Sequence, residues 1–289
     1  MVRILRATLN PIQTDRLTPT CRTPKYHWNK RRIIVTQYKT DDLAIQQLSD
    51  YRSINPGILF QDGTVKLNIV EAYALQDAVT RLRTMDHERV IGFKVGCTGP
   101  GTTKLFGLEG PIRGTLFENE MQPNGANLDY RSFFNLAVEA EMAIEIGTNN
   151  NISAVFPIIE LHNFVFRAPQ KTLPELISNN GLNKGFVTSD TDWKKPSSFY
   201  DQKSRLSLEI NGSVIDSGDL WPMTDGPSAS VDWLAGHLAD HSLELSSGDI
   251  VLGGTALGLH LVKSGDSITA AIDDEVAVHC FVDTPNYSN

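Results

Sequence analysis

The stretch 138–146 reads VEAEMAIEI and places three glutamates, Glu139, Glu141 and Glu145, in an otherwise apolar run. Strict alternation at its start is typical of a β-strand, whose successive side chains point to opposite faces. The glutamates then share one face, with neighbouring same-face residues about 6 to 7 Å apart. Two such carboxylates can converge on one cation. A surface strand with its charged face in water is the alternative that this stretch alone leaves open.

Two further charges stand alone in apolar runs and favour a polar site inside the core. Glu160 lies within VFPIIELHNF (155–164), and Lys94 lies within IGFKVGC (91–97). A buried carboxylate is costly unless it is paired or binds a metal. Spacing leaves open whether Lys94 belongs to a reactive site or forms a structural ion pair with a glutamate.

Composition excludes several classes of function. The 289 residues are 40% hydrophobic and 21% charged, which is typical of a globular protein of one large domain or two smaller ones. The net charge of -8 argues against a nucleic-acid partner, because phosphate contacts need clustered basic residues. No apolar run is long enough for a transmembrane helix, so we expect no membrane partner. Three widely spaced cysteines favour a reducing compartment, and we expect a cytoplasmic protein.

Residues 1–40 differ from the remainder, since they hold nine lysines or arginines and one acid, Asp15. Such a leader resembles an organellar transit peptide if the source is eukaryotic, which would imply organellar import. A disordered basic arm is one alternative. Translation from a start at Val35 in a bacterial source is another. In each case we expect residues 1–40 to lie outside the fold.

The rest of the chain predicts an α+β protein, with a small helical part at 41–88, a β-rich domain at 89–283 and a tail at 284–289. Apolar periodicity predicts helices over 41–52 and 67–85, and Asn68 can cap the second. Asn211-Gly212 predicts a hairpin, and Pro227 is typical of a first helical turn. The polar segment 167–204 has no clear period, and we expect a lid, a binding loop or a disordered region.

Seven motifs occur in an order that resembles a known enzyme family. They are IGFKVGCT, LFGLEGPIRGTLFEN, VEAEMAIEI, PIIEL, GPSASVDWLAGHL, GDIVLGGTALG and SGDSI. The series is similar to 2-keto-4-pentenoate hydratases of the fumarylacetoacetate hydrolase (FAH) superfamily, with 4-oxalocrotonate decarboxylases as close relatives. The resemblance covers roughly residues 41–283. It implies a mixed β roll around a metal ion, assembly into homo-oligomers, and possible association with a pathway aldolase or decarboxylase.

The resemblance also implies roles for individual residues. Metal ligands are expected at Glu139, Glu141 and Glu160, and oxygen ligands suit Mg²⁺ or Mn²⁺. Lys94 matches a lysine beside the metal, and Thr255, in GGTALG, matches a residue of the loop that holds the substrate carboxylate. The expected catalytic residues are Lys94, Glu139 and Glu141. We expect burial beside a cation to lower the pKa of Lys94 enough for proton transfer.

Two histidine positions remain open on the residues alone. His162 can share the strand face of Glu160, and it is a candidate for contacting substrate beside Lys94 and Thr255. His237 and His241 are four residues apart on a predicted helix, a spacing that can bind zinc. Histidines near a helix end that favour the helix dipole are the preferred interpretation of this pair.

Three departures from the family pattern leave the exact substrate open. Only 18 residues separate Glu141 from Glu160, fewer than is usual. Asn163 stands where the family tends to have aspartate, and residues 179–181 replace a typical Asp-Asn-Ala-Ser pattern. The metal ligands match, whereas the residues that face the substrate differ.

The resemblance implies a divalent-metal-dependent hydratase that adds water to a 2-hydroxy-2,4-dienoate and gives a 4-hydroxy-2-oxo acid, as in meta-cleavage aromatic catabolism. The expected partner is this small acid substrate. A 4-oxalocrotonate-type decarboxylase or an acylpyruvate C–C hydrolase on the same metal site is the alternative. A non-catalytic partner subunit is a second alternative.

Overall fold

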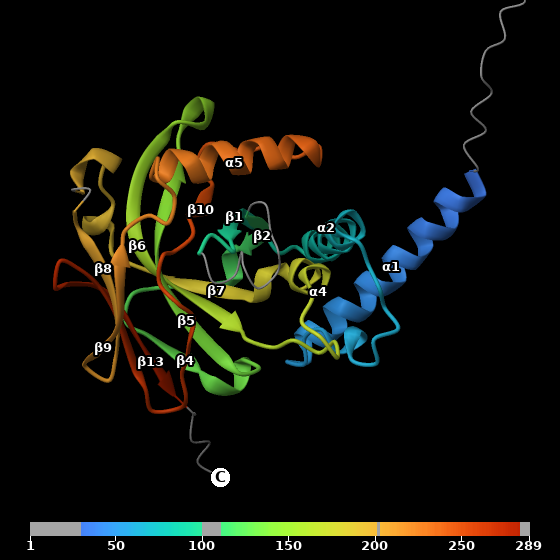
Figure 1. The fold of residues 1–289 in the computed structure, drawn as a ribbon, viewed down its shortest axis with the longest axis horizontal. Helices are drawn as coiled ribbons and strands as arrows, with labels where there is room; N and C mark the ends of the chain where they lie inside the picture. Colours follow the sequence, from blue (N-terminus) through green and yellow to red (C-terminus); the bar gives the residue numbers. More distant parts are fainter. Residues whose placement is uncertain (1–29, 100–110, 201–202, 284–289) are drawn as a thin grey trace, which may run out of the picture.

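The computed structural model describes residues 30–99, 111–200 and 203–283 (Figure 1). Most of the leader, residues 1–29, lies outside the described part, so the expectation that residues 1–40 lie outside the fold stays a prediction there. Helix α1 (Lys30–Arg52) begins ahead of Asp41, the residue at which folded structure is expected to begin. Nothing is described of the side chains of residues 30–38.

Two mixed sheets form the body of the molecule. The larger has the order β2 (Ile112–Phe117), β1 (Val90–Gly96), β10 (Ile250–Leu252), β5 (Leu136–Ile146), β6 (Ile152–Asn163), β7 (Asn183–Thr188) and β3 (Met121–Gln122), with β11 (His260–Leu261) paired to β5. The smaller has the order β4 (Ala126–Asp129), β13 (Glu275–Asp283), β12 (Ser267–Ile272), β8 (Arg205–Ile210) and β9 (Ser213–Asp219). The sheets are mixed because the β1–β10, β3–β7 and β4–β13 pairs are parallel. The β12 and β13 strands contact β6, so the two sheets share one core.

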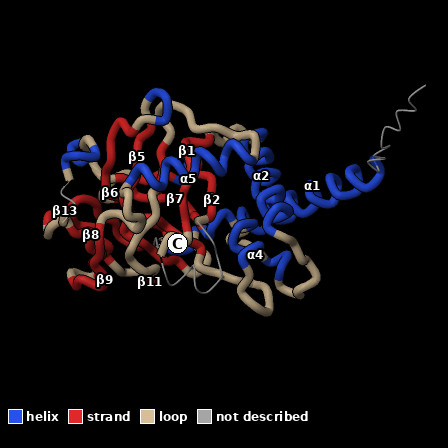
Figure 2. Tube along the Cα trace, turned by 45° about the horizontal axis from the view of Figure 1, so that its top comes forward, coloured by secondary structure: helices blue, strands red, loops and turns tan. Residues whose placement is uncertain are grey.

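The helices lie in two places. Helices α1, α2 (Ile69–Met85) and α4 (Leu173–Ser178) gather on one side of the strands (Figure 2). Helix α5 (Pro227–Asp240) lies over the strands. Short 3₁₀ turns occur at Ile58–Phe60, Glu118–Glu120, Tyr130–Ser132, Thr148–Asn150, Asn180–Leu182, Thr191–Trp193 and Ser197–Phe199. No helix in the described part has the length and hydropathy needed to cross a membrane.

Local signals account for several boundaries. Asn68 accepts a hydrogen bond from the Glu71 amide at 2.9 Å, and the Glu71 carboxylate accepts one from the Asn68 amide, which forms a capping box at the start of α2. Between β8 and β9, Asn211 has φ 54° and Gly212 has φ 73°, as a type I′ hairpin turn requires. These features confirm the predicted cap and hairpin.

Strand β5 is central to the larger sheet and lies between β10 and β6. Nine of its 11 residues are buried, and only Glu139 and Glu145 are partly exposed. The alternative of a surface strand with a solvated acidic face is therefore wrong. Because both faces of β5 are covered, the fold places Glu141 inside the protein at 2% exposure.

The segment 167–204 is more ordered than the sequence predicts. It contains α4 and β7, and β7 pairs with β6 inside the larger sheet. The expectation of an irregular lid is wrong for these residues. Each element is only six residues long, so neither covers enough turns or alternations to show a period.

Candidate active site and metal centre

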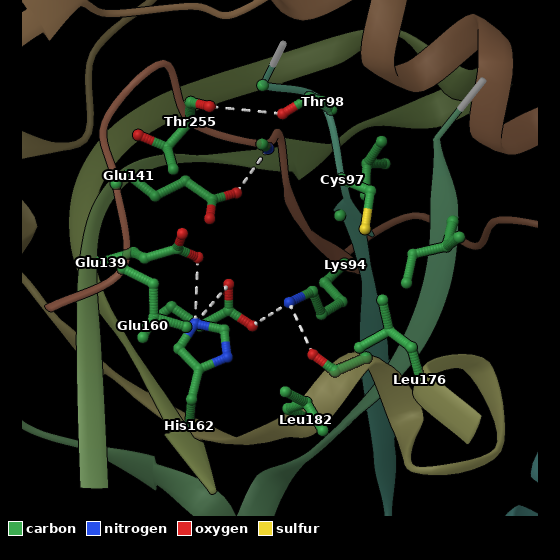
Figure 3. Close-up of a pocket in the computed structure, with 18 of the residues that line it drawn as sticks. Lys94, Cys97, Thr98, Glu139, Glu141, Glu160, His162, Leu176, Leu182 and Thr255 are labelled. Atoms are coloured by element: carbon green, nitrogen blue, oxygen red, sulfur yellow. Dashed lines mark hydrogen bonds and ion pairs between the residues drawn. The ribbon is translucent and has the colours of Figure 1, made fainter. Parts of the chain in front are cut away.

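Three glutamates meet at one end of a cavity of about 420 Å³. Glu139 on β5 stands directly opposite Glu160 on β6, and Glu141 lies one step further along the same face of β5. Glu160 is 1% exposed. Figure 3 shows the three carboxylates together with Lys94 and His162 in this cavity. The structure thus brings these five predicted residues together.

Lys94 reaches the carboxylates from β1. Its Nζ lies 2.7 Å from Glu160 Oε1 and 3.4 Å from the Gly181 carbonyl oxygen (Figure 3). The neighbouring strand β2 accommodates the lysine stem through Gly114, since a Cβ there would lie 2.8 Å from Lys94 Cγ and 2.8 Å from the Asn180 carbonyl oxygen. A side chain at this position would push Lys94 away from Glu160.

Asn183, at the start of β7, also holds Glu160. Its amide Nδ2 donates a hydrogen bond of 2.7 Å to Glu160 Oε1 and is buried. The sequence analysis missed this residue. The departure from the family pattern at residues 179–181, immediately before it, was the signal that could have directed attention to Asn183.

The loop after β10 orients Glu141. The Gly254 amide donates a hydrogen bond of 2.5 Å to Glu141 Oε1. Gly254 has φ +85°, and a Cβ there would lie 2.5 Å from Thr98 Oγ1, so the position requires glycine. The next residue, Thr255, lines the cavity, but its hydroxyl donates to the Ala140 carbonyl at 2.8 Å. The Thr255 side chain therefore fixes the loop against β5.

His162 lies beside two of the carboxylates. Its Nε2 is 3.1 Å from Glu139 Oε2 and 3.5 Å from Glu160 Oε2 (Figure 3). These are ion-pair distances, but the geometry falls outside that of a hydrogen bond. Neither ring nitrogen has a hydrogen-bond partner within the described residues. The side chain is nevertheless buried.

The buried charges change the pKa values of their neighbours. Burial raises the pKa of Glu141 well above its ordinary value, and Glu160 and Glu139 add to the effect against the opposing influence of Lys94. Burial also opposes charge on Glu160, but Lys94 and His162 outweigh it and lower the Glu160 pKa. For Lys94, burial lowers the pKa, and the surrounding glutamates, Glu160 first, more than offset this. Without a cation, the net Lys94 pKa is raised. The expected lowering concerns the site with a bound cation and stays a prediction.

The residues present fit a divalent cation. Glu139, Glu160 and His162 each offer one ligand atom, and these atoms lie within 4.8 Å of one another. Glu141 belongs to the predicted ligand set but not to this tightest group. Three carboxylates against one ammonium leave an excess of negative charge in a buried site, and a cation would neutralise it. Carboxylate oxygens suit Mg²⁺ or Mn²⁺ among the common cations, and an imidazole favours a transition-metal ion.

The rest of the cavity is mostly apolar. Phe164, Phe166 and Leu182 contribute to its wall, together with Cys97. Lys171 also lines it, and its Nζ lies 5.5 Å and 5.2 Å from the centres of the Phe164 and Phe166 rings. The sequence analysis missed Lys171, which lies in the polar segment without a period.

The remaining candidates lie elsewhere. His237 stacks on Trp233 with ring centroids 5.0 Å apart and is 4.7 Å from the Tyr73 ring. Neither His237 nor His241 belongs to the metal-capable group found within the described residues. Glu145 lies outside the cavity and pairs with Lys194 at 2.7 Å.

Known proteins of similar sequence are hydratases and decarboxylases. The 2-oxo-hept-4-ene-1,7-dioate hydratase of Escherichia coli is 24% identical over 234 residues, which are 74% of this chain and 87% of that protein. The 2-keto-4-pentenoate hydratase of Burkholderia vietnamiensis is 26% identical, with coverage of 70% and 81%. A 4-oxalocrotonate decarboxylase of Pseudomonas putida is 23% identical, with coverage of 71% and 81%. The chain resembles the hydratase and decarboxylase family. No protein-family model matches it.

Solved structures show the same fold. The 4-oxalocrotonate decarboxylase from Pseudomonas putida G7, complexed with magnesium and adipate, superposes with a TM-score of 0.78 at 20% identity, over 85% of this chain and 98% of that one. A fumarylpyruvate hydrolase from Pseudomonas aeruginosa, in complex with Mn²⁺ and pyruvate, gives a TM-score of 0.53 at 18% identity, over 68% and 90%. These matches confirm the predicted mixed α+β fold.

Proposed function

We propose that this chain is a divalent-metal-dependent hydratase that adds water to a 2-hydroxy-2,4-dienoate. One observation carries the proposal: three glutamates, one lysine and one histidine meet at the polar end of an otherwise apolar cavity. A short unsaturated acid has a matching distribution of charge, with an anionic head and a hydrocarbon chain. Hydratases among the sequence relatives support the choice of reaction.

Glu139, Glu141 and Glu160 would hold the cation, which we propose to be Mg²⁺ or Mn²⁺. When bound, it would supply the positive charge that attracts the carboxylate of a 2-oxo acid and offsets negative charge on the neighbouring oxygen. This accounts for an anionic substrate in a protein with a net charge of -8. Gly254 keeps Glu141 in place through its backbone hydrogen bond.

Lys94 would bind and orient the substrate. An ammonium group has three hydrogens to donate. The Glu160 carboxylate and the Gly181 carbonyl accept two of them, which leaves the third for a substrate oxygen. In the absence of a cation, the carboxylates around Lys94 raise its pKa and so favour its protonated form.

The apolar part of the cavity would hold the hydrocarbon chain. Phe164 and Leu182 exclude bulk water from this part, so that added water must reach the double bond in a defined position. In the reaction, the dienol gains a proton at C5 and loses its enol proton, which gives the conjugated 2-oxo-3-enoate. The hydroxyl group of water then bonds to C4 and a proton bonds to C3. The product is a 4-hydroxy-2-oxo acid.

A decarboxylase is the second candidate. Its support is the fold match to a 4-oxalocrotonate decarboxylase over 98% of that chain. Such an enzyme would use the same polar end of the cavity, and the bond broken would be one to a carboxylate carbon, with release of CO₂. The buried carboxylates and Lys94 argue against a non-catalytic partner subunit, because such a subunit would have no need to maintain them.

The Glu141→Gln substitution tests the proposed site. We expect it to lower Mg²⁺- or Mn²⁺-dependent consumption of a 2-hydroxy-2,4-dienoate by about tenfold or more, because it removes a charged ligand. Loss of the dienoate absorbance measures the rate, and circular dichroism verifies the fold.

Glu145→Gln is the matched control, since Glu145 lies on the same strand but pairs with Lys194 outside the cavity. It should keep the activity of the unmodified protein. Full metal-dependent activity in Glu141→Gln would show that the site assignment is wrong.

A further inference from the structure

We propose that His162 is a ligand of the cation in this chain and that its nitrogen makes the site favour Mn²⁺ over Mg²⁺. The proposal deepens the proposed function, since it concerns the same site. Its starting point is geometric. His162 Nε2 and one oxygen each from Glu139 and Glu160 form a group of three potential ligand atoms within 4.8 Å.

The Nε2 atom of His162 lies against the carboxylates of Glu139 and Glu160, but the geometry is not that of a hydrogen bond. The residue is 2% exposed, and neither nitrogen has a hydrogen-bond partner within the described residues. A buried polar group without a hydrogen-bond partner destabilises the folded protein. A cation held between the carboxylates would satisfy Nε2.

The strand register explains how the imidazole reaches the carboxylates. His162 follows Glu160 by two residues on β6, so both side chains lie on one face. The residue opposite His162 on β5 is Ala137, whose methyl group leaves space above it. The ring can therefore lean diagonally toward Glu139, which is the contact observed at 3.1 Å.

The nitrogen changes which cation the site prefers. Mg²⁺ is bound mainly by oxygen ligands and water, whereas imidazole binds transition-metal ions well. Compared with carboxylates alone, a site with one imidazole ligand should bind Mn²⁺ more tightly. The imidazole should not increase the affinity for Mg²⁺ to the same extent. The sequence alone predicts only oxygen ligands and makes His162 a candidate for contacting substrate. A histidine that binds the metal and one that contacts substrate differ in a measurable way.

The test uses Mn²⁺ bound to the full-length protein after removal of metals with EDTA. Electron spin echo envelope modulation detects nitrogen bonded to Mn²⁺, and we expect this signal in the unmodified protein. Labelling histidine with the heavy nitrogen isotope should change the modulation. This measurement needs no variant, so it remains decisive even if a substituted protein fails to fold.

Substitution then assigns the signal to one residue. His162→Gln should lose the nitrogen modulation and weaken Mn²⁺ binding by about tenfold or more, with a smaller effect on Mg²⁺ binding in calorimetric titrations. His279→Gln, on β13 and outside the cavity wall, is the control and should retain both properties. Absence of nitrogen modulation in the unmodified protein, or its persistence in His162→Gln, would overturn the proposal.

These measurements are independent of turnover. Protein that binds Mn²⁺ through His162 but converts no dienoate would support this inference and contradict the proposed function. Active protein whose Mn²⁺ shows no bound nitrogen would support the proposed function and contradict this inference. In that second case, an increased KM with unchanged metal affinity in His162→Gln would assign the histidine to the substrate.

Discussion

Lys94 and Glu160 depend on each other inside the protein. Their charged atoms lie 2.7 Å apart, and their side chains are 5% and 1% exposed. Removing one member of such a pair leaves an uncompensated buried charge, which costs more than the pair contributes. Both residues could be predicted from the sequence, because each is a single charge in an apolar strand. For Asn183, the departure from the family pattern at residues 179–181 was the one signal, and it does not single out this residue.

Substituting Lys94 with methionine should destabilise the metal-free protein. We expect a loss of about 3 to 5 kcal/mol in the free energy of unfolding, since Glu160 remains buried without its cation. Mn²⁺ should restore part of the loss by placing positive charge beside Glu160. Urea unfolding in EDTA and in Mn²⁺ measures both effects.

The control for this prediction is Lys194→Met. Lys194 pairs with Glu145 at the same distance of 2.7 Å, but both side chains are about one-third exposed. Its loss should cost at most about 1 kcal/mol. Equal losses in the two variants, or no effect of Mn²⁺ on Lys94→Met, would contradict this account of the buried charges.

Helices α2 and α5 meet through aromatic and histidine side chains. His237 on α5 stacks on Trp233 and contacts Tyr73 of α2. Burial, followed by the positive charges of Arg113 and His241, lowers the pKa of His237 to about 4. The helices themselves were predictable from their periods and caps. The short α4 and β7 could not be predicted, because six residues are too few to show a period. Pairing with β6, rather than a local pattern, determines β7.

This contact makes stability depend on pH. The folded pKa of His237 is below its ordinary value of 6.5, so the unfolded chain binds the proton more readily. The contribution of His237 is therefore complete above about pH 6.5 and decreases as the pH falls toward about 4. Because the His237 side chain is only partly buried, solvent screening reduces the effect to roughly 1 kcal/mol.

Urea unfolding at about pH 7 and about pH 5 checks this prediction. The unmodified protein should lose more stability between the two values than His237→Gln does, because glutamine does not titrate. The comparison removes the effect of other groups that titrate in the same range. Identical losses in the two proteins would show that His237 is not buried in its neutral form.

At the scale of the whole molecule, strands of the larger sheet and the segments between them create one cavity from residues far apart in the chain. Lys94, Glu160 and Gly254 come from three different regions of the sequence and line the same space. The order of the motifs was enough to predict the fold, because it matches a family whose topology is known. The reaction was not predictable to the same degree, since hydratases and decarboxylases share this fold and these motifs. The cavity wall from residues 164–182 has no counterpart in the motif series.

The most direct test of the central claim is the product formed from a 2-hydroxy-2,4-dienoate by protein with and without its metal. Protein stripped with EDTA and reloaded with Mn²⁺ is incubated with the dienoate, and the product is identified by mass spectrometry and by nuclear magnetic resonance. We predict that reloaded protein gives a 4-hydroxy-2-oxo acid heavier by one water molecule, while stripped protein leaves the dienoate unchanged. Failure of the reloaded protein to convert the dienoate, or equal conversion without metal, would contradict the account.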